Sequence, residues 1–251
     1  MSGLDRSTFL RPIAHRGLHD KGAGRIENTA PAFQAGIAGG FGIECDIRPA
    51  AGGLPVVFHD ESTERLIGES RCVAELTAAD LLRLRHGDGS PILRLSELID
   101  LVAGRVPLLV EIKSDFGAPD ESFLKEVTRL SLAYAGPLVL MSFDPDLMAK
   151  MRALAPSVPR GIVAAGTGPD DPLARRIGPE RARELSQLLG SGAAGPDFYA
   201  YRVSDLPTPV TRYAREVQGV PLFAWTVRTH EDYEIASRWA DAPIFEGLLP
   251  P

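Results

Sequence analysis

The chain has 251 residues, 44% hydrophobic and 24% charged, which is ordinary for a soluble globular protein. A net charge of −6 argues against a broad nucleic-acid surface, and the basic run 174–183 contains Glu180, as a solvated helix face does. Cys45 and Cys72 form no C-x-x-C pattern, which excludes a disulfide framework and a cysteine zinc site. Without a signal peptide or an 18-residue apolar run, we expect a cytoplasmic protein that does not insert into membranes.

Eight short apolar runs are typical of strands, and helix-length amphipathic stretches lie between most of them. The predicted strands, in chain order, are residues 12–15, 42–47, 107–113, 137–143, 159–164, 197–202, 221–227 and 242–247. The predicted helices are about 31–39, 95–103, 120–133, 145–154, 179–189, 207–218 and 230–239. This alternation predicts an α/β fold, a (β/α)8 TIM barrel, formed by residues 1–251 as a single domain. An open doubly wound sheet is the alternative, but no Gly-rich phosphate turn follows the first strand.

Two irregularities interrupt the pattern. After the second strand, "RPAAGGLPVVFHD" contains a Gly-Gly turn and an alternating run, which predicts a hairpin. We expect residues 60–92 to be a small insertion over one barrel end, with a helix at 78–85, since they are too few for a core of their own. The chain also ends without room for an eighth helix. Another segment or a second subunit is expected to cover that face, so a homo-oligomer is one predicted state.

The stretch "FGIECDIRP" (41–49) places two carboxylates in an otherwise apolar strand. Because side chains alternate along a strand, Glu44 and Asp46 share the face directed into the barrel and Cys45 faces the helices. On the third strand, Glu111 and Lys113 share a face in the same way. Both pairs lie near the carboxyl ends of their strands, where barrel enzymes keep their chemistry, so the three carboxylates are expected to converge.

Converging carboxylates repel one another and raise at least one pKa unless a cation compensates them. All-oxygen ligands favour Mg²⁺ or Ca²⁺, with Mn²⁺ as a further option, over zinc. We therefore predict one divalent cation bound by Glu44, Asp46 and Glu111. The alternative is two structural ion pairs, Asp46 with Arg48 and Glu111 with Lys113.

Two histidines are expected beside these carboxylates: His15 ends the first predicted strand in "AHRG", and His59 ends the predicted hairpin in "VVFHD". Their ordinary pKa near 6.5 suits general acid and general base catalysis. Arg16 and Lys113 would add positive charge for a phosphate. The combination predicts phosphoryl transfer. We interpret the other histidines, His19, His86 and His230, as surface residues.

Seven motifs in order resemble the glycerophosphodiester phosphodiesterase family and extend from residue 13 to about residue 227. They are "HRG" (15–17), "ENTAPAF" (27–33), "GIECDIRP" (42–49), "LPVVFHD" (54–60), "VEIKS" (110–114), "SFDPDLMAKMR" (142–152) and "WTV" (225–227). The resemblance implies a barrel of the phosphatidylinositol-phospholipase-C-like type. It also implies metal-dependent hydrolysis of glycerophosphodiesters to glycerol 3-phosphate and an alcohol.

The resemblance also implies roles for individual residues. The metal-ligand positions are Glu44, Asp46 and Glu111; the acid/base positions are His15 and His59; the phosphate-facing positions are Arg16 and Lys113. Trp225 corresponds to a residue that lines the family's substrate pocket. Glu27 and Asn28 are candidates for substrate binding that could instead hold the loop after the first strand.

The ending "APIFEGLLPP" departs from the family's usual last strand and helix. A lysophospholipase D or sphingomyelinase-D-like lipid phosphodiesterase is the nearest alternative, although the polar loop "ESTERLIGES" offers only Leu66 and Ile67 to a lipid. A catalytically inactive binding module is the alternative from another class, and the chemically competent site positions argue against it. Attack on phosphorus by a glycerol hydroxyl and direct attack by water both stay open.

Overall fold

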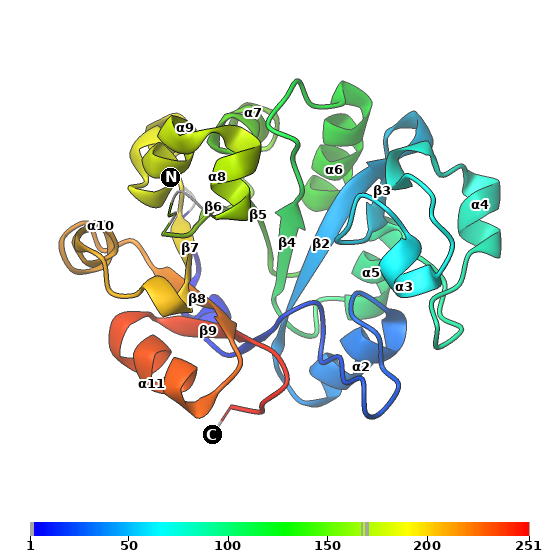
Figure 1. Cartoon of the computed structure of the whole chain (residues 1–251), viewed down its shortest axis with the longest axis horizontal. Helices are drawn as coiled ribbons and strands as arrows, with labels where there is room; N and C mark the ends of the chain where they lie inside the picture. The colour runs from blue at the N-terminus through cyan, green and yellow to red at the C-terminus, as the bar shows by residue number, and fades with distance from the viewer. Residues whose placement is uncertain (1–2, 167, 169–170, 251) are drawn as a thin grey trace. The chain divides into compact units, whose positions relative to one another are not determined.

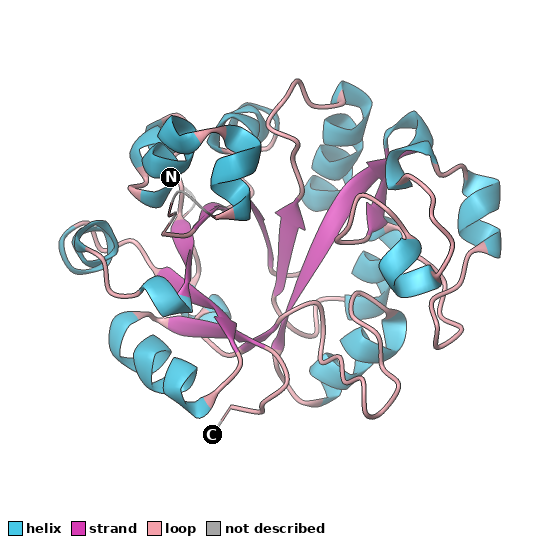
Figure 2. Ribbon diagram, viewed as in Figure 1, coloured by secondary structure: helices cyan, strands magenta, loops and turns pink. Residues whose placement is uncertain are grey.

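Nine strands alternate with helices in the computed structural model, which describes residues 3–166, 168 and 171–250 (Figures 1 and 2). The elements group into two compact units. The 13–139 unit is Ile13–Val139, and the 140–251 unit is Leu140–Pro251 together with Met1–Pro12. We describe each unit by itself.

The sheet of the 13–139 unit is organised around its longest strand, β2 (Gly42–Ala50). Strands β1 (Ile13–Ala14) and β4 (Leu108–Ile112) pair with it in parallel, and β3 (Leu54–Val57) pairs in antiparallel orientation. All residues of β4 and the first six of β2 are buried, as expected for near-continuous apolar runs covered on both faces. The parallel pairings bring the carboxyl ends of β2 and β4 together.

The predicted hairpin is confirmed. A short 3₁₀ turn, Ala51–Gly53, joins β2 to β3, and both Gly52 (φ 74°) and Gly53 (φ 75°) adopt left-handed backbone conformations that favour glycine. The turn places β3 against β2 with Ile47 opposite Val57, so the chain leaves β3 beside the carboxyl end of β2. This geometry positions the residues that follow β3.

The segment between β3 and the helix α5 (Leu95–Val102) contains α3 (Glu64–Ile67), a 3₁₀ turn (Val73–Glu75) and α4 (Ala78–Arg83). Helix α4 was predicted two residues longer, and α3 was not predicted. The apolar side chains of the segment share a buried cluster with the hairpin, which they cannot form alone. The cluster consists of Ala50, Val56, Phe58, Val73, Leu76, Leu81, Leu84 and Ile92.

The surface interpretation of His86 is wrong. Its side chain is buried, with its ring centroid 5.8 Å from that of Phe58 and its Nδ1 3.0 Å from the carbonyl oxygen of Ser90. An imidazole can join an apolar cluster through its ring when a backbone group satisfies a polar edge. His19 is half-buried and His230 is exposed.

Three helices of the 13–139 unit agree with the predicted positions to within one or two residues: α2 (Ala30–Ala38), α5 and α6 (Glu121–Ala133). Pro31 lies in the first turn of α2, and the Asp120 carboxylate accepts hydrogen bonds from the first amides of α6.

Five strands pair in parallel in chain order in the 140–251 unit, and only the first two residues of β5 belong to the 13–139 unit. They are β5 (Leu138–Ser142), β6 (Arg160–Ala164), β7 (Phe198–Arg202), β8 (Leu222–Val227) and β9 (Ala242–Phe245). The helices are α1 (Arg6–Phe9), α7 (Pro145–Leu154), α8 (Pro172–Ile177), α9 (Pro179–Ser186), α10 (Pro209–Arg212), which continues as a π-helix (Tyr213–Val217), and α11 (His230–Trp239). Short 3₁₀ turns occupy Leu189–Gly192 and Val203–Asp205. Helices α1 and α8 were not predicted.

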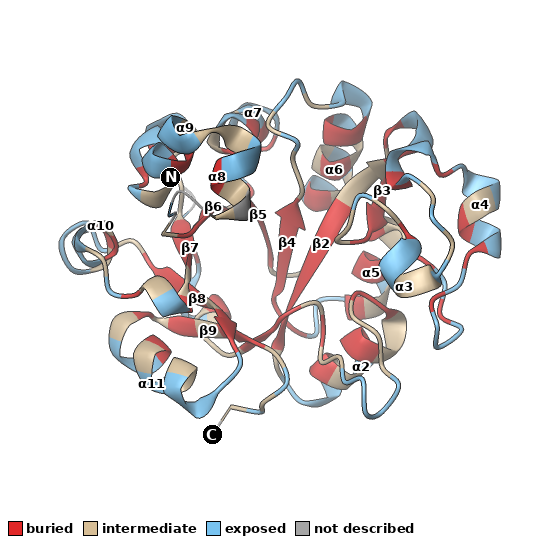
Figure 3. Ribbon diagram, viewed as in Figure 1, coloured by how far each residue is buried: buried red, intermediate tan, exposed pale blue. Residues whose placement is uncertain are grey.

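Eight of the nine described strands thus pair in parallel and alternate with helices, and the fold is an α/β (β/α)8 barrel, as predicted. The strands are mostly buried and the helices carry exposed outer faces (Figure 3). Between Phe245 and residue 250 the described chain contains no helix. Among the described helices, none is long and apolar enough to cross a membrane. The single-domain organisation stays a prediction.

The two glycines of the hairpin turn allow a matched test. A Cβ at Gly52 would meet no atom within 4 Å, whereas a Cβ at Gly53 would overlap Ser122 Oγ and lie 2.7 Å from Phe123 N. We expect Gly52→Ala to cost about 1–2 kcal/mol through its backbone conformation alone. Gly53→Ala should cost a further ~1–3 kcal/mol because α6 must move. Urea unfolding of both variants measures this, and equal losses would contradict the packing argument.

Candidate active site

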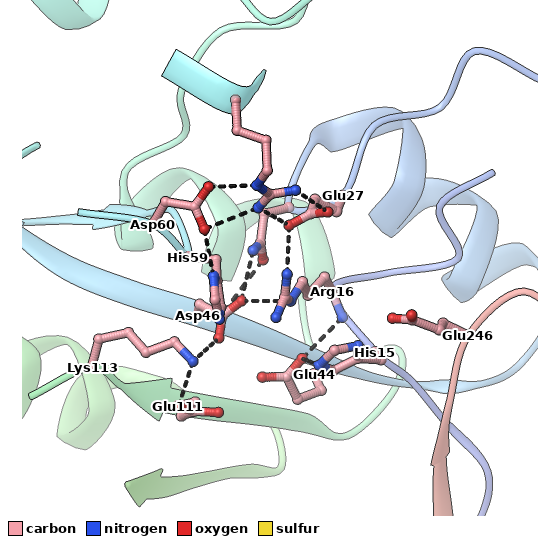
Figure 4. Close-up of polar contacts among 12 residues, drawn as sticks. His15, Arg16, Glu27, Glu44, Asp46, His59, Asp60, Glu111, Lys113 and Glu246 are labelled. Atoms are coloured by element: carbon pink, nitrogen blue, oxygen red, sulfur yellow. Dashed lines mark hydrogen bonds and ion pairs between the residues drawn. The ribbon is translucent and has the colours of Figure 1, made fainter. Parts of the chain in front are cut away.

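Three carboxylates converge where β2 and β4 run side by side (Figure 4). Asp46 and Glu111 are register partners on the two strands, and Glu44 lies two residues before Asp46 on the same face. The three side chains are buried, and one oxygen from each lies within 4.8 Å of the others. The convergence predicted from strand alternation is therefore confirmed.

Two cationic side chains reach this carboxylate cluster. Lys113 Nζ lies 2.8 Å from Asp46 Oδ1 and 2.6 Å from Glu111 Oε1 (Figure 4). Arg16 places Nε 3.1 Å from Asp46 Oδ2, and its backbone amide donates a hydrogen bond to Glu44 Oε2. The alternative of two structural ion pairs is thus present in part: Lys113 pairs with Glu111, but Arg48 turns away and donates from Nε to the carbonyl oxygen of His59 at 2.7 Å.

The cationic side chains do not compensate the three carboxylates equally. Although burial opposes its charge, Lys113 and Arg16 hold the pKa of Asp46 well below its ordinary value. Burial, followed by repulsion from Asp46 and Glu111, raises the pKa of Glu44 well above its ordinary value. Glu44 Oε1 is buried and has no hydrogen-bond partner among the described residues. The cluster therefore has one carboxylate whose charge the protein does not satisfy.

The loop after β1 supports Asp46 from the other side. Asn28, in a left-handed conformation (φ 59°), donates from Nδ2 to Asp46 Oδ2 at 2.9 Å and accepts from the Asp46 amide at 3.3 Å. It is fully buried. Glu27 accepts from Arg16 Nη1 at 2.6 Å and also contacts Arg65. Of the two roles considered for Glu27 and Asn28, these contacts favour holding the loop and the charged cluster.

The two histidines lie on opposite sides of the cluster (Figure 4). His15 is buried, with Nε2 3.9 Å from Glu44 Oε2. His59 is one-third exposed, and its Nδ1 lies 2.6 Å from Asp60 Oδ1. Burial lowers the pKa of His59, in spite of the opposing charge of Asp46. Because the Asp60 carboxylate can only accept, it favours a proton on Nδ1 and leaves Nε2 for proton transfer.

Asp60 and Arg65 contribute to the site and were not predicted. Asp60 directly follows His59 in "VVFHD", and a carboxylate next to a candidate catalytic histidine was the available signal. Arg65 gave no such signal, because it belongs to α3 in a polar stretch that we interpreted as a surface loop. Its role depends on the path of the chain after the hairpin.

Trp225 belongs to the 140–251 unit. Its indole Nε1 donates to the carbonyl oxygen of Ala200 at 3.1 Å, and its ring meets Phe143 edge to face, with centroids 5.4 Å apart. Both aromatic side chains are half-buried. The role of Trp225 in substrate binding stays a prediction.

Ion pairs join four carboxylates to three cationic side chains, and Glu44 is the fifth carboxylate of the group, which leaves an excess of two negative charges when all of these side chains are ionised. The carboxylates are Glu27, Glu44, Asp46, Asp60 and Glu111, and the cations are Arg16, Arg65 and Lys113. Oxygen donors, an unsatisfied buried carboxylate and this charge excess all fit a hard divalent cation. Flanking imidazoles add groups for proton transfer.

Comparisons with known proteins find similar sequences and structures over most of the chain. A model of the glycerophosphoryl diester phosphodiesterase family matches residues 15–245. A protein of Mycobacterium tuberculosis named "Probable glycerophosphodiester phosphodiesterase 1" is 29% identical over 246 residues, covering 88% of this chain and 83% of its own.

Solved structures are also similar. The glycerophosphodiester phosphodiesterase of Thermotoga maritima is 25% identical, with a TM-score of 0.70 over 94% of this chain and 93% of that one. A phosphodiesterase of Oleispira antarctica, solved with sn-glycerol-3-phosphate, is 21% identical, with a TM-score of 0.69 over 94% and 92% of the two chains. These likenesses support the barrel fold.

The contribution of Glu27 to the stability of the fold should depend on pH in the acidic range. Burial raises its pKa, but the hydrogen bond from Arg65 and the charge of Arg16 outweigh this and hold the pKa at about 2, below the ordinary value of 4.5. A depressed pKa stabilises the fold above pH 4.5, and this contribution is lost as the pH falls toward 2. Glu27→Gln should be less stable than the native protein by about 1.5–3 kcal/mol at pH 6.

That difference in stability should shrink as the pH falls from 4.5 toward 2. Urea unfolding of both proteins at several pH values, with EDTA present, measures it. A gap between the two proteins that stays constant over this range would contradict the assignment.

Proposed function

Because this chain belongs to the glycerophosphoryl diester phosphodiesterase family of enzymes, we propose that it hydrolyses glycerophosphodiesters to glycerol 3-phosphate and an alcohol in a metal-dependent reaction. The observation that carries the proposal is the buried cluster of Glu44, Asp46 and Glu111 between His15 and His59. The Oleispira antarctica phosphodiesterase was solved with sn-glycerol-3-phosphate, which makes this product the first one to assay.

We assign Glu44, Asp46 and Glu111 as the ligands of one divalent cation, Mg²⁺ or Ca²⁺, with Mn²⁺ as a substitute. The unpartnered Oε1 of Glu44 and the excess negative charge support this assignment. When bound, such a cation would act as a Lewis acid toward phosphate oxygens and lower the pKa of a nearby hydroxyl.

The chain's own residues would then move the protons and hold the charge. His15 and His59 would share the roles of general base for the attacking hydroxyl and general acid for the departing alcohol oxygen. By accepting a hydrogen bond from Nδ1 of His59, the Asp60 carboxylate would leave the reactive Nε2 on the opposite edge of the ring. Arg16 and Lys113 carry more N–H donors than their contacts with Glu27, Asp46 and Glu111 use, so donors remain for the phosphate.

The activity prediction uses three substrates: glycerophosphocholine, glycerophosphoethanolamine and lysophosphatidylcholine. We expect glycerol 3-phosphate from the first two, and EDTA should abolish its release. His15→Ala and His59→Ala should each lower kcat by about 10²–10⁴-fold, the usual contribution of general acid–base catalysis.

Activity that survives both chelation and the histidine substitutions would contradict the proposal. Lysophosphatidic acid released from lysophosphatidylcholine alone would instead identify a lysophospholipase D. Release of no product from any of the three would favour a binding module.

Metal binding has a test that needs no turnover. With Ca²⁺ or Mg²⁺ at ~100 times its dissociation constant, binding to the folded state alone adds ~2.7 kcal/mol, which corresponds to a rise in Tm of about 5–10 °C. Glu44→Gln should abolish most of this rise. Cys45→Ala, on the opposite face of the same strand, is the matched control and should keep the full rise while lowering Tm through lost packing. Equal responses of the two variants would rule out Glu44 as a ligand.

A further inference from the structure

The guanidinium of Arg65 lies between two carboxylates that belong to different parts of the 13–139 unit. Nε and Nη2 donate to Asp60 Oδ2 and Oδ1 at 2.5 and 3.0 Å. Nη1 and Nη2 donate to Glu27 Oε2 and Oε1 at 2.9 and 2.8 Å. One side chain therefore makes two-point contacts with both partners, a geometry that only the planar fork of arginine provides.

Each of these carboxylates holds a residue of the proposed machinery. Asp60 contacts Nδ1 of His59, and Glu27 contacts Nη1 of Arg16 (Figure 4). Arg16 in turn contacts Asp46 through Nε and Glu44 through its backbone amide. Arg65 thus connects the histidine that follows β3 with the cationic and carboxylate groups that follow β1 and lie on β2.

We propose that Arg65 is a positioning residue for the phosphodiesterase reaction, acting chiefly on His59 through Asp60, with a secondary contact to Arg16 through Glu27. The proposal rests on the proposed function above. It gives the insertion a task beyond covering the hairpin, since α3 of the insertion carries this residue.

The physical reason lies in the exposure of Asp60. The side chains of Asp60 and Arg65 are 24% and 47% exposed, so water competes for the oxygens of the Asp60 carboxylate. A single hydrogen bond to the imidazole of His59 therefore does not fix the orientation of that carboxylate. With both Asp60 oxygens engaged by Arg65, rotation of the carboxylate is restricted, and Oδ1 stays directed at Nδ1 of His59. Loss of Arg65 would let Asp60 turn to solvent and free the ring of His59 to rotate or to change tautomer.

A purely structural role predicts something different. Partly exposed ion pairs contribute little to stability. If Arg65 only joined the insertion to the loop after β1, its loss would therefore affect folding weakly and catalysis hardly at all. Arg83 is the matched control. It lies on α4 of the same insertion, its side chain is 56% exposed, and its Nη1 and Nη2 donate to Glu69 at 3.0 Å each. Neither contact involves a residue of the site.

The kinetic experiment compares Arg65→Met, Arg65→Lys and Arg83→Met on glycerophosphocholine with saturating metal. We expect Arg65→Met to lower kcat by about tenfold or more, as loss of a residue that orients a functional side chain does. KM should change less. Arg65→Lys keeps the charge but cannot fork to two carboxylates, so it should restore only part of kcat. Arg83→Met should leave both constants unchanged.

A double-mutant cycle separates positioning from structural damage. If Arg65 acts largely through His59, Arg65→Met should lower the residual activity of His59→Ala far less than it lowers that of the native protein. An equal loss in both backgrounds, or a native kcat in Arg65→Met, would overturn the proposal.

Nitrogen NMR of the imidazole of His59 tests the same inference without turnover. At a pH where the ring is neutral, the native protein and Arg83→Met should show the Nδ1–H tautomer, and Arg65→Met should show a mixture of both tautomers. An unchanged tautomer in Arg65→Met would overturn the proposal. If the native protein is inactive on every phosphodiester, the proposed function fails, and this spectrum alone decides the role of Arg65.

Discussion

The site depends on keeping Asp46 ionised in the interior. A buried carboxylate is costly unless ion pairs and hydrogen bonds compensate it, and Asp46 receives Lys113 on Oδ1 and both Arg16 and Asn28 on Oδ2. These partners come from β4 and from the loop after β1. The same charge therefore fixes where that loop lies, and through the loop it fixes His15 and Glu27. Removing its negative charge would leave two largely enclosed cations, Arg16 and Lys113, without their main partner.

Satisfying Asp46 has a consequence for Glu44. The nearby cations bind Asp46 and Glu111 preferentially, so Glu44 keeps one buried oxygen without a hydrogen bond and has a raised pKa. Each oxygen of Asp46 thus forms an ion pair with a cationic side chain, whereas its neighbour two residues away forms none with Arg16 or Lys113. Such unevenness is typical of functional sites, where local stability is given up for binding or chemistry.

Much of this was predictable because it depends on short-range rules. Strand alternation placed Glu44 and Asp46 together and Cys45 opposite, and the Gly-Gly turn predicted the hairpin that delivers His59. Predictions were wrong or missing where distant segments meet. His86 is buried only because Phe58 and the insertion share a cluster, and Arg65 contacts Glu27 across 38 positions of sequence. Neither contact leaves a periodic signal in the chain.

The main chain of β2 also connects the segments that carry the candidate site. Phe58 N donates to the Asp46 carbonyl oxygen at 3.0 Å, and Lys113 N donates to the Ile47 carbonyl oxygen at 3.0 Å. The residues that carry His59 and the Lys113 ammonium are thereby joined by main-chain hydrogen bonds to the strand that carries the carboxylates. Protons on these two amides can exchange with solvent only when their hydrogen bonds to the central strand open, so hydrogen exchange at Phe58 and Lys113 reports the opening of the strand that carries the carboxylates.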